Sequence, residues 1–76
     1  MTITYKRDDS HNRYLVYFGD DRIGFVKKLS VGNGNWASNW NAVDIFMDKD
    51  RDFPSRAKAG DWLKREYERA IRDGRV

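Results

Sequence analysis

The chain has 76 residues, and its 15 lysines and arginines against 12 acidic residues leave a formal charge of +3. A length of this order corresponds to one domain. With no cysteine and a single histidine, the composition excludes a disulfide framework and a zinc site. The first residues lack the form of a signal peptide, and no apolar run is long enough to cross a membrane, so we expect a cytoplasmic protein.

Strand patterns fill the first part of the chain. Residues 2–7 alternate between apolar and polar side chains, and residues 13–18 are rich in aromatic and branched residues. The polar residues 8–12 predict a turn between them, and residues 19–21 predict a hairpin turn. These patterns predict two paired antiparallel strands.

A third strand is predicted over residues 22–29, where alternation resumes. Successive side chains of this strand are expected to point to opposite faces of the sheet. Ile23, Phe25 and Leu29 are expected on one face, and Val26 and Lys28 on the other.

The segment after the third strand is less regular. Residues 30–35 contain two glycines and predict a loop, and residues 36–47 predict a fourth extended segment. The alternation breaks within that segment, which predicts either a bulge near Asn41 or two short strands. Residues 48–52 predict a charged loop.

A helix is predicted over about residues 56–73. Ser55 is a suitable N-cap after Pro54, and Gly74 stands where a helix commonly stops. Apolar residues recur at helical spacing between these signals and predict a stripe packed on the sheet. The stripe contains Ala59, Trp62, Leu63, Tyr67, Ala70 and Ile71.

These elements predict an α+β fold made of one domain over residues 1–76. Three to four antiparallel strands within residues 2–47 form a meander, and the C-terminal helix packs on one of its faces. The other face of the sheet is then left open to solvent or to a partner.

A tryptophan at the start of the last strand is followed by Phe53, Ser55, Ala59 and the pair Trp62-Leu63. This order resembles a pattern of small phage and prophage proteins with a strand-strand-strand-helix layout. The layout is similar to that of the arm-type DNA-binding domains of phage and transposon integrases and of the plant AP2 domain. The resemblance implies that the sheet enters the DNA major groove while the helix braces it. Free-standing phage proteins of this size also include inhibitors of host defence, such as anti-CRISPR proteins. The resemblance thus implies that the protein acts in the cytoplasm of a bacterial host cell.

Three patterns suggest chemistry but lack the required residues. Asp48, Asp50 and Asp52 alternate as calcium ligands do, but phenylalanine and alanine occupy the positions that need glycine and glutamate. The glycines of residues 32–34 lack the lysine of a phosphate-binding loop. No cysteine is available as a nucleophile, and His11 lies in a predicted turn. We therefore expect a non-enzymatic protein without metal, cofactor or small-molecule substrate.

Binding is expected on the open sheet face, where cations and aromatic residues alternate. Charges on the helix are expected to pair at i, i+4 spacing, as in Asp61 with Arg65, and its cations offer a second phosphate-contacting stripe. The expected partner is nucleic acid or a host nucleoprotein. Alternatively, the protein is a protein-binding inhibitor of a host system, or a homodimer formed by two open faces. Trp36 and Trp40 belong either to the core or to the interface. The candidate residues are Lys6, Arg13, Tyr17, Lys28, Trp40, Arg65 and Arg69.

Overall fold

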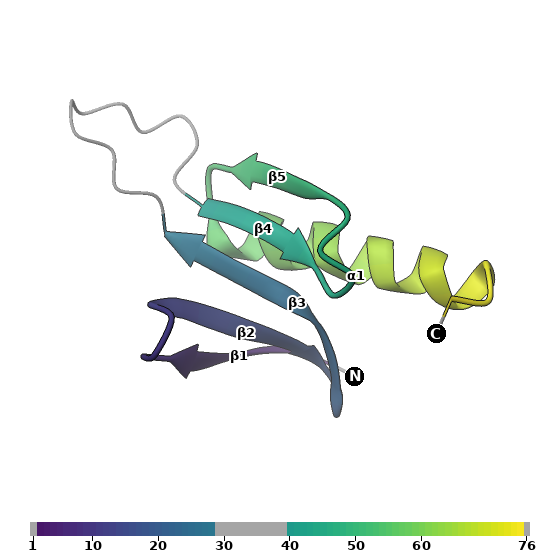
Figure 1. Cartoon of the computed structure of the whole chain (residues 1–76), viewed down its shortest axis with the longest axis horizontal. Coiled ribbons are helices and arrows are strands. Elements are labelled where there is room, and N and C mark those ends of the chain that lie inside the picture. The colour runs from purple at the N-terminus through teal and green to yellow at the C-terminus, as the bar shows by residue number, and fades with distance from the viewer. Residues whose placement is uncertain (1, 29–39, 76) are drawn as a thin grey trace.

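The computed structural model describes residues 2–28 and 40–75, which form a five-stranded antiparallel sheet and one C-terminal helix (Figure 1). Strands that follow one another in the sequence are neighbours in the sheet. The α+β meander is therefore confirmed, with five strands in place of the three to four predicted. The elements are β1 (Ile3–Asp8), β2 (Arg13–Phe18), β3 (Asp21–Lys28), β4 (Trp40–Asp44), β5 (Asp50–Phe53) and α1 (Arg56–Arg72).

The additional strand is β5, which lies in the segment predicted as a charged loop. It pairs with β4 at the edge of the sheet, with Phe53 opposite Trp40 and Arg51 opposite Ala42. Charged residues are common on edge strands because they discourage pairing with another chain. Because of these charges, the sequence pattern of β5 is typical of a loop.

The turn between β4 and β5 is held by the buried carboxylate of Asp44, which is 5% exposed. Its Oδ1 accepts hydrogen bonds from the backbone N–H groups of Asp48 at 2.9 Å and Lys49 at 3.4 Å. The C-terminal end of the chain contacts the same turn, because Arg75 donates to the Asp48 carboxylate at 2.6 Å. These contacts fix the start of β5.

A register shift between β2 and β3 changes which residues of β3 face the helix. Tyr17 pairs with Arg22 and Val16 pairs with Gly24, so Ile23 is an additional residue without a partner on β2. An inserted residue exchanges the two faces of the strand beyond it. Val26 is therefore fully buried and Phe25 lies on the open face, the reverse of the prediction.

The strand predicted to contain an irregularity is regular where the structure describes it. β4 pairs residue by residue with β3 from Trp40 to Asp44, so the bulge predicted near Asn41 is wrong within this range. The glycine loop at residues 32–34, together with Leu29 and Trp36, lies outside the described residues.

The helix begins and ends close to the predicted positions. The Ser55 hydroxyl accepts a hydrogen bond from the backbone N–H of Lys58 at 3.2 Å, which confirms the N-cap. Gly74 follows the last turn with a φ of +78°, a left-handed conformation that glycine adopts readily. Ile71 is 50% exposed and therefore falls outside the buried stripe, contrary to the prediction. Within the described residues, no helix is both long enough and apolar enough to span the membrane.

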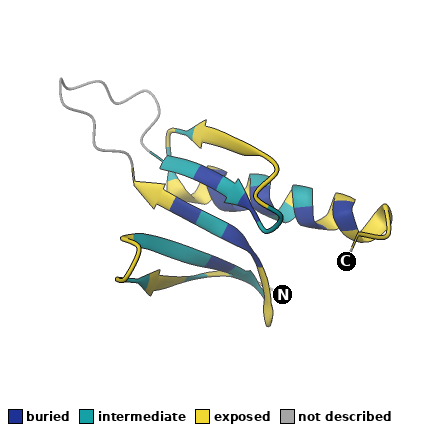
Figure 2. Cartoon of the chain, viewed as in Figure 1, coloured by how far each residue is buried: buried dark blue, intermediate teal, exposed yellow. Residues whose placement is uncertain are grey.

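The core lies between α1 and one face of the sheet, where the buried positions of Figure 2 meet. Val16, Val26, Ala42 and Leu63 are each fully buried there. Trp40 packs against this core, and its ring centroid lies 6.0 Å from that of Tyr14. Trp40 therefore belongs to the core side of the sheet.

Candidate nucleic-acid interface

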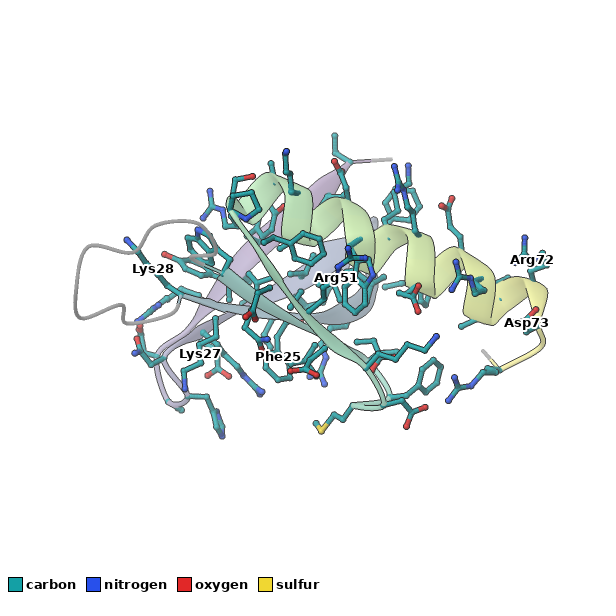
Figure 3. The ribbon with its side chains drawn as sticks, turned by 90° about the horizontal axis from the view of Figure 1, so that it is seen from above. Phe25, Lys27, Lys28, Arg51, Arg72 and Asp73 are labelled. Atoms are coloured by element: carbon teal, nitrogen blue, oxygen red, sulfur yellow. The ribbon has the colours of Figure 1, made fainter. Side chains whose placement is uncertain are left out.

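Three predicted binding residues lie on the sheet face that α1 leaves uncovered: Lys6, Arg13 and Tyr17. Their neighbours along each strand point the other way, since Tyr5 and Val16 pack into the core under the helix. Phe25 and Lys27 join them on the uncovered face, as Figure 3 shows.

Two other predicted residues, Lys28 and Trp40, do not belong to that face. They are paired across β3 and β4, in the same alternation as Val26 and Ala42, which are buried under the helix. The open face expected for Lys28 is therefore wrong, because the register shift at Ile23 places Lys27 there and exposes Lys28 on the other side. For Trp40, which the sequence left between core and interface, the structure shows the core side.

Arg13 is held within the open face by two neighbours. Its Nε donates to the Asp8 carboxylate at 3.0 Å, and its guanidinium carbon lies 4.3 Å from the centroid of the Phe25 ring. The hydrogen bond from Arg13 lowers the pKa of Asp8 below its usual 3.8. With its side chain only 18% exposed and a carboxylate already bound, Arg13 is poorly placed to contact a phosphate.

The open face is divided between the two charge signs. The exposed cations of this face are Lys6 on β1 and Lys27 on β3, whereas the carboxylates of Asp50 and Asp52 lie on β5. The Asn41 amide donates to Asp50 at 3.3 Å and to Asp52 at 2.8 Å, so both carboxylates are fixed on this side of the sheet. A polyanion that covers the whole face would meet these carboxylates.

A second surface is the groove between β5 and α1, which contains Arg65 and Arg69 from the prediction. Helical spacing places residues 58, 62, 65 and 69 along one flank of α1. β5 and the turn before it supply the opposite wall, including Arg51, which Figure 3 shows on the side facing α1. The groove is lined by Lys49, Asp50, Arg51, Phe53, Lys58, Asp61, Trp62, Arg65, Glu66 and Arg69.

Aromatic rings form the floor of this groove. The ring centroids of Phe53 and Trp62 lie 5.7 Å apart in a tilted arrangement, and both side chains are only partly buried. The guanidinium carbon of Arg51 lies 5.7 Å from the centroid of Phe53. Trp62, predicted as a core residue, thus contributes to the core and to the surface of the groove.

The groove's cations are not neutralised as the sequence predicts. The Glu66 carboxylate pairs with Lys49 from the β4–β5 turn and with Arg69 on the helix, each at 3.1 Å. None of the ion pairs formed within residues 2–28 and 40–75 joins Asp61 to Arg65, Lys64 to Glu68 or Glu68 to Arg72.

Three groove cations take part in none of those ion pairs. Arg51, Lys58 and Arg65 have no carboxylate partner within 4.0 Å in the part of the chain that the structure describes. Their charges are therefore available to an anionic ligand. Of these three, only Arg65 was predicted as a site residue.

Asp48, Asp50 and Asp52, whose spacing resembles that of calcium ligands, accept hydrogen bonds from different residues. Asp48 binds Arg75, while Asp50 and Asp52 accept from Asn41. Among the described residues, no group of three or more histidine, aspartate or glutamate side chains is arranged to hold a metal ion.

Comparisons of the chain with protein families, curated proteins and solved structures found no match, so the resemblance to phage proteins and integrase arm-type domains stays a prediction.

Proposed function

We propose that this protein is a non-enzymatic binding domain that contacts nucleic acid through the groove between β5 and α1. One observation carries the proposal: five cations surround this groove against three acidic residues, an excess of two positive charges beside a partly exposed tryptophan. The whole chain carries only +3, so most of its net charge is concentrated here.

The chemistry of the groove suits a nucleic-acid backbone. Arg51 and Arg65 face each other across it, and guanidinium groups bind phosphate oxygens through two parallel hydrogen bonds. Trp62 lines the same groove and offers a ring on which an unpaired base can stack. Cations at the rim and an aromatic floor together favour a single strand over a closed duplex.

The groove supports this function better than the open sheet face does. Asp50 and Asp52 occupy one side of that face, and Arg13 is already bound to Asp8. Phosphate binding depends on counterion release by accessible cations, and fixed carboxylates oppose it. The proposed binding surface is therefore the groove beside α1, whereas the sequence predicted the open face of the sheet.

The proposal is tested by fluorescence anisotropy with labelled single-stranded and duplex oligonucleotides at several salt concentrations. The variant Arg51→Gln with Arg65→Gln removes two groove charges. If both contact phosphates, the slope of log affinity against log salt becomes shallower by about 1.4–1.8. The single-stranded oligonucleotide is expected to bind more tightly than the duplex.

A matched variant, Lys6→Gln with Lys27→Gln, removes the same charge from the open face. It should keep the salt slope of the original protein. If both variants show the same decrease in the salt slope, net charge alone drives binding. If only the open-face variant shows a shallower salt slope, the nucleic acid contacts the open face of the sheet and not the groove.

A protein-binding inhibitor is the second candidate function. It is favoured by the partly buried apolar side chains of Leu15, Phe25 and Val43, which lie side by side on the uncovered face. Capture of one host protein that persists after nuclease treatment, combined with no measurable oligonucleotide binding, would favour this candidate.

A further inference from the structure

We propose that the single strand bound in the groove continues onto a second site, where Lys28 and Arg56 bind its phosphates beside the rings of Tyr14 and Trp40. The inference rests on the proposed function, because it concerns another part of the same strand. The second site lies on the helix side of the sheet, at the end where β3 ends and where β4 and α1 begin (Figure 1).

Two partly buried rings form the base of the second site. The ring centroids of Tyr14 and Trp40 lie 6.0 Å apart, and their planes are tilted by 51°. Both side chains pack against the core but are not fully covered by it. Rings of this kind can stack with an unpaired base whatever its sequence.

Lys28 lies beside one of these rings. It is paired with Trp40 in the register of β3 and β4, so the two side chains share a face of the sheet. Lys28 is exposed at the end of β3. Two residues that the sequence indicated for binding are therefore neighbours on the helix side of the sheet.

Arg56 brings a second cation to the other ring. Its guanidinium carbon lies 5.2 Å from the centroid of Tyr14. The guanidinium carbon of Arg7 lies at the same distance from this ring, but the Arg7 Nε donates to the Asp9 carboxylate at 2.8 Å. The first turn of α1 contains no acidic residue that could pair with Arg56 in the same way.

The charges of Lys28 and Arg56 are therefore available to a ligand. Within residues 2–28 and 40–75, neither side chain has a carboxylate within 4.0 Å. One exposed cation beside each ring matches the alternation of phosphates and bases along a single strand. A phosphate would also weaken the repulsion between the guanidinium groups of Arg56 and Arg7.

Phe53 connects the second site to the groove. It lies opposite Trp40 in the register of β4 and β5, and its ring centroid is 5.7 Å from that of Trp62 in the groove. A row of aromatic residues thus leads from β2 to α1: Tyr14, Trp40, Phe53 and Trp62. A strand that follows this row from the groove reaches Lys28 and Arg56.

The test is fluorescence anisotropy with oligothymidines of about 4 and about 12 nucleotides, lengths within the range of known single-strand sites. The shorter strand is expected in the groove, which has three unpaired cations against two at the second site. The longer strand should reach both sites. The second-site variant, Lys28→Gln with Arg56→Gln, should therefore make the slope of log affinity against log salt shallower by about 1.4 for the longer strand only.

Two matched variants separate this inference from the proposed function. The groove variant, Arg51→Gln with Arg65→Gln, should make the slope shallower for both lengths, whereas Lys6→Gln with Lys27→Gln, on the uncovered face, should keep both slopes. If the groove variant changes the slope for the longer strand and the second-site variant does not, the second site is wrong while the groove keeps its function. A second-site variant that affects both lengths equally, or no more than the uncovered-face variant does, would also overturn the second site. An original chain that binds neither strand would refute the proposed function itself.

Tryptophan fluorescence tests the stacking at Trp40. The longer strand should quench the fluorescence more than the shorter one, because it brings a base to Trp40 as well as to Trp62. Trp40→Phe keeps a ring against the core and should lose this additional quenching, and thermal melts confirm that the variants are folded. Additional quenching that survives in Trp40→Phe would overturn the second site.

Discussion

Leu63 of α1 packs directly on the backbone of Gly24 in β3. A Cβ atom at Gly24 would lie 2.8 Å from Cδ2 of Leu63 and 2.5 Å from the carbonyl oxygen of Val43. The φ of Gly24 is +150°, a conformation that residues with a side chain rarely adopt. The absence of a side chain thus allows the helix to approach the sheet.

Substitution of Gly24 tests this close approach. We expect Gly24→Ala to destabilise the protein by about 1–3 kcal/mol, because the added methyl group clashes with the backbone carbonyl of Val43 and overpacks the contact with Leu63. Urea denaturation measures the change. Gly74→Ala provides a comparison, since a Cβ there has the same unfavourable sign of φ, at +78°, but meets no atom within 4 Å. If Gly74→Ala costs as much as Gly24→Ala, backbone conformation rather than packing explains the loss.

Removal of the Leu63 side chain tests the core itself. Leu63 is fully buried, so Leu63→Ala should destabilise by about 2–5 kcal/mol. Ile71→Ala removes an apolar side chain from the same helix, but Ile71 is 50% exposed, and the change should stay within about 0.5 kcal/mol. Thermal melts of both variants give the comparison. Equal effects would contradict the orientation of α1.

The fold was predictable where local signals agree with tertiary contacts. Aromatic and branched residues identified β2, and the Ser55 cap together with Gly74 identified α1, because these features depend on neighbouring residues. The face assignment of β3 was wrong because the extra residue at Ile23 depends on pairing with β2. β5 was missed because the core requires only Phe53 from it, and the other three residues are charged.

The candidate site was predictable only in part, for a related reason. Arg65 and Arg69 were identified from helical spacing, but their partners across the groove lie on β5. Without β5, nothing in the sequence places Arg51 or Lys49 near the helix. The strand alternation of Arg51 and Phe53 against Asp50 and Asp52 was the signal that could have revealed this wall.

A pH-dependent contribution to stability is expected from Asp8. The hydrogen bond from Arg13 lowers its pKa in the folded protein below the usual 3.8. A lowered folded-state pKa contributes stability above the unfolded pKa, and the contribution is lost as pH falls through the folded value. Asp8→Asn should therefore be less stable than the original chain at pH 7.

The difference between Asp8→Asn and the original chain should shrink as the pH is lowered below about 4. Urea midpoints at neutral and acidic pH measure it. Asp20→Asn, in the exposed turn between β2 and β3, should match the original chain at both pH values. A difference for Asp8→Asn that persists unchanged in acid would assign the effect to side-chain geometry instead of charge.

Glu66 provides a prediction in which stability and binding change in opposite directions. Its side chain is 11% exposed, and its carboxylate holds Lys49 and Arg69 in ion pairs at 3.1 Å. Glu66→Gln keeps the shape but removes the charge, so the folded protein loses both ion pairs and should be less stable. The same change leaves two cations free for phosphates, and nucleic-acid affinity should therefore rise at low salt.

The salt dependence distinguishes released phosphate contacts from a general change in net charge. If Lys49 and Arg69 each gain a phosphate, the slope of log affinity against log salt should steepen by about 1.4–1.8 for Glu66→Gln. Asp20→Asn removes one negative charge in the turn between β2 and β3, far along the chain from the groove residues, and should leave the slope unchanged. Anisotropy titrations of both variants decide between the two explanations. An unchanged slope for Glu66→Gln would mean that Lys49 and Arg69, which Glu66 holds, do not face the bound nucleic acid.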